Sequence, residues 1–241
     1  MGKVVERYFE GIFTSLNPSG FEEILDGVLH TITAEDNVGA ASDFHADEVF
    51  QALKQMAPLT APGPDGMSPI FYKSFWHIVG KDVMEVVLNV LNSGIILESL
   101  NTTYIALIPK IKDLKKVADF RPISLCNVIY KLIAKLVANH LKKFLIQTIP
   151  DSQSAFLSGR LIFDNILVAF ETLHYLKRKT IGKLGYMALK HNMSIAYDRV
   201  EWEFLEKIMH HLGLDDKDDL NHNVMHENGL LLDSFEWAAC G

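Results

Sequence analysis

The residues with the clearest chemical potential lie in one stretch, ALKHNMSIAYDRVEWEFLEKIMHHLG, which runs from Ala188 to Gly213. Asn192 lies near the end of the segment GKLGYMALKHNM, which is rich in apolar residues, and Tyr197 and Asp198 follow it at the start of a helical pattern. Mg²⁺ prefers hard anionic oxygens, so a carboxylate at the end of a rigid strand is a natural metal ligand. Asn192 has nearly the shape of aspartate, but it is uncharged and carries a donor NH₂ in place of one oxygen.

Other metal-ligating residue types gather near the end of the sequence. They are four histidines and one cysteine, namely His210, His211, His222, His226 and Cys240. These residues lack the paired spacing of structural zinc sites. Two Asp-Asp pairs, 215–216 and 218–219, precede the polar segment LNHNVMHEN, which cannot form an apolar strand. We therefore predict no metal site here and interpret the acidic pairs as a solvated loop.

Basic residues are concentrated in the middle of an acidic chain. The net charge of the 241 residues is −7, but residues 101–147 carry eight lysines and one arginine against two aspartates, a local charge of +7. Residues 1–60 carry ten acids against three bases, and residues 211–241 carry seven acids against one base. A basic middle is compatible with a phosphate-binding surface, although a solvated helix face would look similar.

Helices must position most of these residues. Apolar spacing predicts helices over 3–15, 20–32, 45–56 and 126–149, the last with its lysines largely off the apolar stripe. The segment TAEDNVGAASD, 33–43, is predicted to be a loop. The proline-rich segment APLTAPGPDGMSP, which follows residue 56, is predicted to be an irregular loop.

The remaining predicted elements lie before and within the stretch from Ala188 to Gly213. Residues 70–94 are predicted to form one helix broken near Gly80, or two helices. A hairpin is expected around 103–123, and an internal strand near 184–191 because apolar residues occupy both of its faces. That strand should lead into a helix over 195–212, which Gly213 ends.

Composition limits the class of protein. Cys126 and Cys240 lie far apart in sequence, so they form no disulfide framework, and a reducing, intracellular location is expected. The first residues lack the apolar core of a signal peptide. No run of about 18 apolar residues occurs, so we expect no membrane span.

Four motifs resemble, in order, the reverse transcriptase domain of LINE-type (non-LTR) retrotransposons in their plant versions. They are PLTAPGPDGMSPIFYKSFW, IALIPKIKDLKKVADFRPISLCNVIYKLIAKLVANHL, QSAFLSGRLIFDNILVAFE and ALKHNMSIAYDRVEWEFLEKIM. The resemblance covers roughly residues 45–213. It implies an α+β, mainly helical fold: the fingers of a polymerase right hand plus the first strand and helix of the palm. The implied domains are an N-terminal helical lead-in over 1–44, fingers over 45–180, the start of the palm over 181–213 and an unrelated or disordered tail over 214–241.

The resemblance also assigns roles to residues outside the chemical stretch. Lys110 and Arg121 match finger residues that meet the phosphates of the incoming nucleotide, where cations neutralise developing charge. Gln153 and Arg160 match the stretch before the palm, for which a template- or nucleotide-binding role and an ordinary loop before a helix are both open. The GPDG turn in the finger region has the same two interpretations.

Three residues match the first catalytic motif. Asn192 stands at the position of the family's metal-binding aspartate, Tyr197 matches the aromatic gate that selects deoxynucleotides, and Asp198 matches the family's second aspartate. The family binds Mg²⁺, an RNA or DNA template-primer and deoxynucleotides. Its downstream Asp-Asp hairpin has no counterpart in this sequence, so the resemblance implies a truncated and degraded copy that does not bind Mg²⁺ productively.

Three functions remain open at this point. The first is an active RNA-directed DNA polymerase, which Asn192 disfavours. The second is a non-catalytic remnant that binds nucleic acid weakly and without sequence preference. The third is a pseudogene product with no molecular role.

Overall fold

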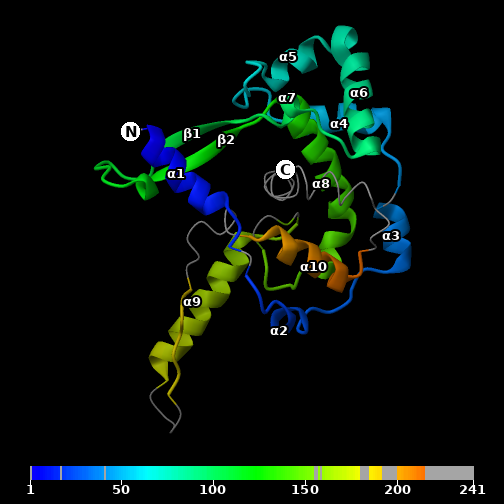
Figure 1. Ribbon diagram of the computed structural model, residues 1–241. Coiled ribbons are helices and arrows are strands. Elements are labelled where there is room, and N and C mark those ends of the chain that lie inside the picture. Colours follow the sequence, from blue (N-terminus) through cyan, green and yellow to red (C-terminus); the bar gives the residue numbers. More distant parts are fainter. Residues whose placement is uncertain are drawn as a thin grey trace.

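The computed structural model describes residues 2–16, 18–40, 42–154, 157, 159–179, 185–191 and 200–214 (Figure 1). In these residues the fold is mainly helical, with one two-stranded sheet. The elements are α1 (Gly2–Phe13), α2 (Glu22–Leu25), α3 (Ala34–Ala40), α4 (Ala46–Gln55), α5 (Pro69–Ser74), α6 (Trp76–Ser93), α7 (Glu98–Asn101), β1 (Tyr104–Pro109), the 3₁₀ turn η1 (Val117–Asp119), β2 (Phe120–Leu125), α8 (Val128–Thr148), α9 (Ile162–Arg178) and α10 (Trp202–Leu212). None of the helices in these ranges is long and apolar enough to span a membrane.

The core forms where α4, α6 and α8 pack together (Figure 1). Fully buried aliphatic side chains come from each helix: Val49 and Leu53 from α4, Val87 and Leu91 from α6, and Leu132, Ile133 and Leu136 from α8. The predicted helices over 45–56 and 126–149 are confirmed, because their periodic apolar residues do reach this core.

The lysines of α8 do not all lie off its apolar face. Lys131 and Lys135 are 5% and 3% exposed, which corrects the prediction from spacing. The ammonium of Lys131 donates a hydrogen bond to the carbonyl of Ala61, at 2.8 Å. A buried ammonium needs such partners, and this acceptor comes from a loop 70 residues earlier in the chain.

Predictions for three segments differ in part from the structure. Residues 33–43 contain α3, because Thr33 and Asp36 form reciprocal hydrogen bonds at its start. Only Glu22–Leu25 is helical within 20–32. Residues 70–94 form two helices, α5 and α6, which confirms one of the two predictions for this segment, but they meet at Phe75 and not at Gly80, which is buried inside α6 beneath Trp76.

The predicted internal strand is also wrong over residues 185–191. These residues have no strand pairing, and Met187 and Leu189 are 83% and 68% exposed. An apolar run becomes a strand only where a neighbouring strand pairs with it, and in the described ranges only β1 and β2 pair. The following helix, α10, begins at Trp202, and Gly213 ends it in a left-handed conformation, φ 105°. Residues 192–199 lie outside the described ranges.

Candidate nucleic-acid interface

The predicted hairpin is confirmed as an antiparallel pair in which Tyr104 lies opposite Leu125 and Pro109 opposite Phe120. Its connection is organised by one carboxylate. Asp119 Oδ2 accepts hydrogen bonds from the backbone N–H groups of Lys115 and Lys116, both at 2.8 Å. These bonds hold the pKa of Asp119 below its ordinary value of 3.8. The Lys110 N–H also donates to the Asp119 carbonyl, at 2.8 Å, so the connection has a defined shape.

Lys110 and Arg121 share one face of the hairpin. Arg121 lies directly opposite Ile108, and Lys110 is two residues after Ile108. Side chains two residues apart lie on the same face of a strand, so the two cations are diagonal neighbours. Both are exposed, as are Lys112, Lys115 and Lys116 in the connection. The Lys110 ammonium also donates to the Ala118 carbonyl, at 3.0 Å. The hairpin thus presents five cations to solvent.

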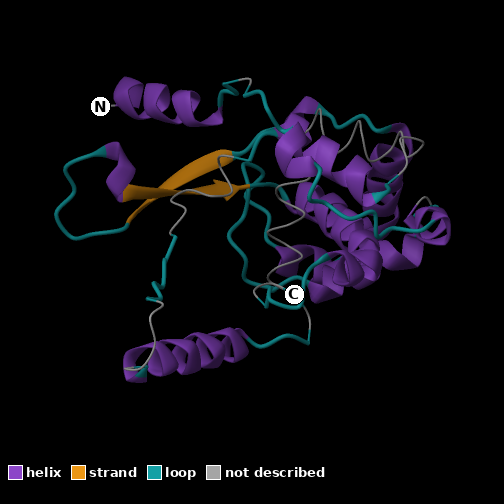
Figure 2. Ribbon diagram, turned by 90° about the horizontal axis from the view of Figure 1, so that it is seen from below, coloured by secondary structure: helices purple, strands orange, loops and turns teal. Residues whose placement is uncertain are grey.

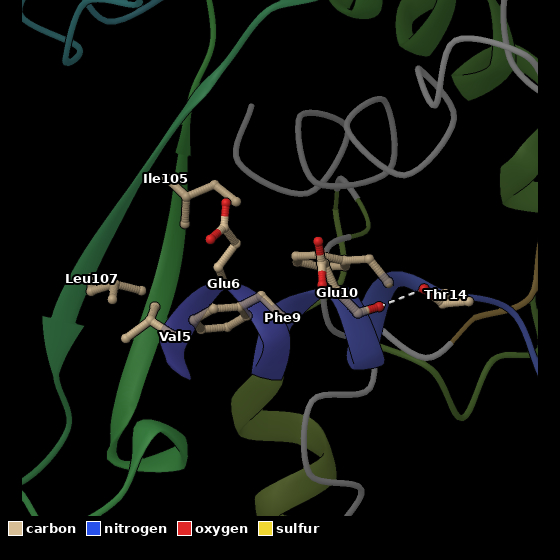
Figure 3. A pocket seen from close by; sticks show the side chains of 8 residues that line it. Val5, Glu6, Phe9, Glu10, Thr14, Ile105 and Leu107 are labelled. Carbon is tan, nitrogen blue, oxygen red and sulfur yellow. Dashed lines mark hydrogen bonds between the residues drawn. The ribbon is translucent and has the colours of Figure 1, made fainter. Parts of the chain in front are cut away.

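The other face of the hairpin is turned towards α1. Ile105 and Leu107 of β1, together with Phe9 of α1, line a pocket of about 910 Å³ between the two elements (Figure 3). Glu6 and Glu10 also line it, one helical turn apart on α1. Two carboxylates repel phosphate, so an anion would approach the hairpin from the face of Lys110 and Arg121 or from its connection.

The GPDG turn is held against the start of α8. The Asn127 Oδ1 accepts a hydrogen bond from the Asp65 N–H, at 3.2 Å, and its Nδ2 donates to the Ser99 carbonyl, at 3.1 Å. A Cβ on Gly63 would lie 2.5 Å from the backbone nitrogen of Asn127, so this position requires glycine. The roles of Asn127 and Lys131 were not predicted from the sequence. The available signal was a pair of polar residues one turn apart in an otherwise apolar helical pattern.

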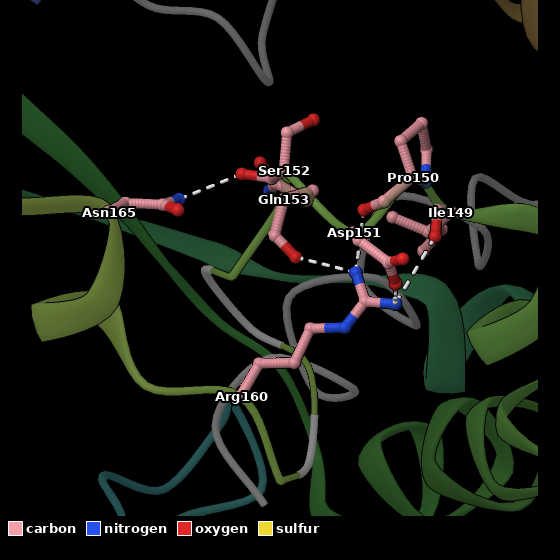
Figure 4. A network of polar contacts seen from close by, with 7 residues as sticks. All are labelled: Ile149, Pro150, Asp151, Ser152, Gln153, Arg160 and Asn165. Atoms are coloured by element: carbon pink, nitrogen blue, oxygen red, sulfur yellow. Dashed lines mark hydrogen bonds and ion pairs between the residues drawn. The ribbon is translucent and has the colours of Figure 1, made fainter. Parts of the chain in front are cut away.

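The half-buried Arg160 is hydrogen-bonded to the loop between α8 and α9 (Figure 4). Its guanidinium donates to the carbonyls of Pro150 and Gln153, at 2.6 and 2.7 Å, and it also contacts the Ile149 carbonyl and the Asp151 carboxylate. Asn165, at the start of α9, donates to the Ser152 carbonyl, at 2.8 Å. These bonds join the end of α8 to the start of α9 and occupy donors that a phosphate would need. The Gln153 side chain is exposed on this loop.

The residues assigned to the catalytic motif are not placed. Asn192, Tyr197 and Asp198 all lie outside the described ranges. Within the described ranges, no cluster of three or more histidine, cysteine or acidic side chains could hold a metal ion.

Helix α10 is docked on the N-terminal segment. The Thr31 and Ile32 N–H groups donate to the Leu212 carbonyl, at 3.1 and 2.9 Å. At the other end of α10, the Ser15 hydroxyl donates to the Glu201 carboxylate, at 2.6 Å. Residues 1–44, expected to be a separate lead-in, therefore contain contacts that fix both ends of α10.

Comparison with known proteins gives two similarities. Residues 108–240 match a family described as "Reverse transcriptase (RNA-dependent DNA polymerase)". Over 200 residues, 82% of the chain, the sequence is 30% identical to the "Transposon TX1 uncharacterized 149 kDa protein" of Xenopus laevis. The chain covers 15% of that protein's length. The family match begins within β1 and includes residues 214–240, the segment that sequence analysis set apart as a tail.

Proposed function

The chain belongs to the reverse transcriptase (RNA-dependent DNA polymerase) family, and from this premise we propose that it binds nucleic acid through the β1–β2 hairpin without polymerising nucleotides. On this proposal the hairpin and the α4–α6–α8 body are the fingers of a LINE-type polymerase, and α10 is the helix after the first catalytic motif. Binding is electrostatic, weak and independent of sequence, and the third alternative, a product with no molecular role, predicts none.

The distribution of exposed cations carries this proposal. Nine basic residues lie within 101–147, but Lys131 and Lys135 are buried in α8. Five of the remaining seven lie on the hairpin and its connection: Lys110, Lys112, Lys115, Lys116 and Arg121. The backbone bonds to Asp119 keep the connection in one conformation, so less ordering is needed when phosphates bind.

Salt dependence tests the binding. If the five cations neutralise three to five phosphates, log Kd should depend on log salt with a slope of roughly 2 to 3.5 on single strands. We expect Kd values in the micromolar range or weaker, because the other side of the strand is not contacted. Replacing all five residues with alanine should abolish binding equally for different RNA and DNA sequences.

A matched control removes a cation from another surface. Lys81 is exposed on α6, so Lys81→Ala should leave both affinity and salt slope unchanged. Circular dichroism should show that the five-alanine variant retains its helices. A complex that is insensitive to salt, or that survives the five substitutions, would show that the hairpin is only a solvated surface.

We infer that the chain does not polymerise nucleotides from the metal ligands that the catalytic motif offers. When bound, two Mg²⁺ ions activate the attacking oxygen and stabilise the leaving pyrophosphate in such polymerases. Asn192 offers one neutral oxygen where a carboxylate is needed, so it does not fit this metal. Loss of that charge is expected to cost roughly 4 kcal/mol or more, which is about a thousandfold or more in rate at about 1.4 kcal/mol for each tenfold.

Primer extension tests this part separately. We expect no template-dependent incorporation with Mg²⁺ or Mn²⁺ on any template. Asn192→Asp alone should not restore activity, because the sequence lacks a recognisable counterpart of the family's Asp-Asp hairpin. Incorporation by the natural chain above a blank without protein would overturn the proposal that it is inactive, whatever the result of the binding experiment.

A further inference from the structure

Asp119 is an acidic residue within the basic connection of the hairpin. Residues 110–121 contain five cations and two carboxylates, which belong to Asp113 and Asp119. By charge alone, either carboxylate should weaken the binding of a phosphate, because like charges repel. The contacts of the two residues differ. Asp113 is exposed and accepts no hydrogen bond from any residue in the described ranges, whereas Asp119 is half-buried and accepts two.

Asp119 fixes the short turn η1 from its last residue. Its Oδ2 accepts hydrogen bonds from the N–H groups of Lys115 and Lys116, both at 2.8 Å, and its own N–H donates to the Lys116 carbonyl, at 3.0 Å. The side chain and the backbone of one residue therefore connect the end of η1 to the residues before it. Figure 2 shows this turn and the loop before it at the end of the two strands, away from the helical body.

The carbonyls of η1 hold Lys110. The Lys110 N–H donates to the Asp119 carbonyl, at 2.8 Å, and its ammonium donates to the Ala118 carbonyl, at 3.0 Å. A lysine ammonium has three donors, so the others remain available to a phosphate. Lysine carries its charge on a flexible stem, and such a side chain has to be ordered when it binds. The Ala118 carbonyl provides that order in advance, but only while η1 keeps its shape.

We propose that Asp119 is a positioning residue that holds the Lys110 ammonium, through the Ala118 carbonyl, where it neutralises a phosphate of bound nucleic acid. This role rests on the proposed function of the hairpin. Without the Asp119 carboxylate, the Lys115 and Lys116 N–H groups lose their acceptor and η1 loses its fixed shape, so Lys110 no longer contributes to binding. Removal of an acid then weakens the binding of an anion, which is the opposite of what charge alone predicts.

The salt dependence of single-stranded RNA binding, measured with the whole chain, tests this role. Asp119→Ala should lower the log–log slope by about 0.7, as if one cation had been removed, and weaken binding roughly fourfold near physiological salt. Lys110→Ala should give the same loss, and the double variant should lose no more than either single variant. Asp113→Ala is the matched control, because it removes the same charge from the same connection. It should keep the natural slope and bind as tightly as the natural chain or slightly more tightly.

A conservative variant separates the hydrogen bonds from the charge. Asp119→Asn is uncharged, as alanine is, but it keeps one side-chain oxygen that can accept both N–H groups, so it should keep the natural slope. If Asp119→Ala and Asp119→Asn both behave like Asp113→Ala, charge alone acts and the proposal fails. A larger loss in the double variant than in Lys110→Ala would contradict action through Lys110.

Hydrogen exchange in the natural chain gives a test that does not depend on how a variant folds. The Lys115 and Lys116 amides should exchange more slowly than the Lys112 amide, which Asp119 does not bind. Equal exchange of the three amides would overturn the proposal. A natural chain that does not bind RNA would overturn the proposed function itself. If the natural chain binds and Asp119→Ala leaves its slope unchanged, only the positioning role of Asp119 fails.

Discussion

Glu48 joins two core helices at the scale of single residues. Its Oε2 accepts a hydrogen bond from the His45 N–H at the start of α4, at 2.9 Å. Its Oε1 lies 3.0 Å from Nε2 of His140 on α8, and the His140 ring stacks on Phe44 at 4.2 Å. Burial by itself would raise the pKa of Glu48. The bonds from His45 and His140, with the charges of His140 and Lys143, nevertheless hold this pKa below its ordinary value of 4.5.

The lowered pKa of Glu48 predicts a loss of stability in acid. A carboxyl group whose pKa is lower in the folded state stabilises the fold above its unfolded pKa. That contribution is lost as the pH falls from about 4.5 through the folded value. Urea denaturation should show Glu48→Gln destabilised by about 1 kcal/mol at neutral pH and less sensitive to acid than the natural chain. Glu85→Gln, which changes an exposed carboxylate on α6, should have little effect, and an equal effect would contradict the role of Glu48.

Single residues also show what the sequence could predict. Val49, Leu53 and Met56 have helical spacing, and all three are buried in the core, as their pattern indicates. The burial of Lys131 was not predictable from spacing, because it depends on the Ala61 carbonyl from a distant loop. The candidate site also contains residues that the sequence could predict and residues that it could not. The exposed Lys110 and Arg121 were accessible to sequence reasoning, whereas the internal bonds of Arg160 depend on how the loop between α8 and α9 folds.

At the scale of elements, the sequence predicted a strand correctly where the strand that pairs with it is near in sequence. The β1–β2 hairpin closes over residues 110–119, and it was predicted nearly at its observed bounds. Helix α3 was missed because its composition is polar, although Thr33 and Asp36 form a capping pair at the recognised spacing. The strand expected over 184–191 required a partner strand, and an apolar run by itself gives no information about one.

The loop before α5 provides a prediction at this scale. A Cβ on Gly63 would meet the backbone of Cys126 and Asn127, both at 2.5 Å, and backbone cannot rotate away as a side chain can. Gly63→Ala should therefore push the loop from α8 and destabilise the fold by about 1–3 kcal/mol, measured by urea denaturation. Gly39→Ala is the control, because its Cβ would enter open space on α3 and should be neutral or slightly stabilising. Equal stability of the two variants would show that the loop is not packed on α8.

At the scale of the whole molecule, the N-terminal segment packs against α10, which lies far from it in sequence. Phe21 and Phe204 are in ring contact at 5.4 Å, and the Asn37 Nδ2 donates to the Gly213 carbonyl, at 2.7 Å. Residues of the N-terminal segment therefore contact both α10 and the glycine that ends it. On the proposed function, α10 is the helix after the first catalytic motif, and these contacts would help to position it.

Gly213 is the position at which this closure can be tested. Its φ of 105° disfavours any residue with a side chain, and a Cβ would lie 2.7 Å from the Ile32 carbonyl oxygen and 2.5 Å from the His30 ring. Gly213→Ala should therefore separate α10 from residues 30–37. In hydrogen exchange, the Thr31 and Ile32 amides, which donate to the Leu212 carbonyl, should lose protection. The Val87 amide in the centre of α6 should keep its protection, because the α4–α6–α8 core does not include Gly213. Gly185→Ala, with open space around its Cβ, should change neither region, and unchanged protection of Thr31 and Ile32 in Gly213→Ala would contradict the docking of α10 on the N-terminal segment.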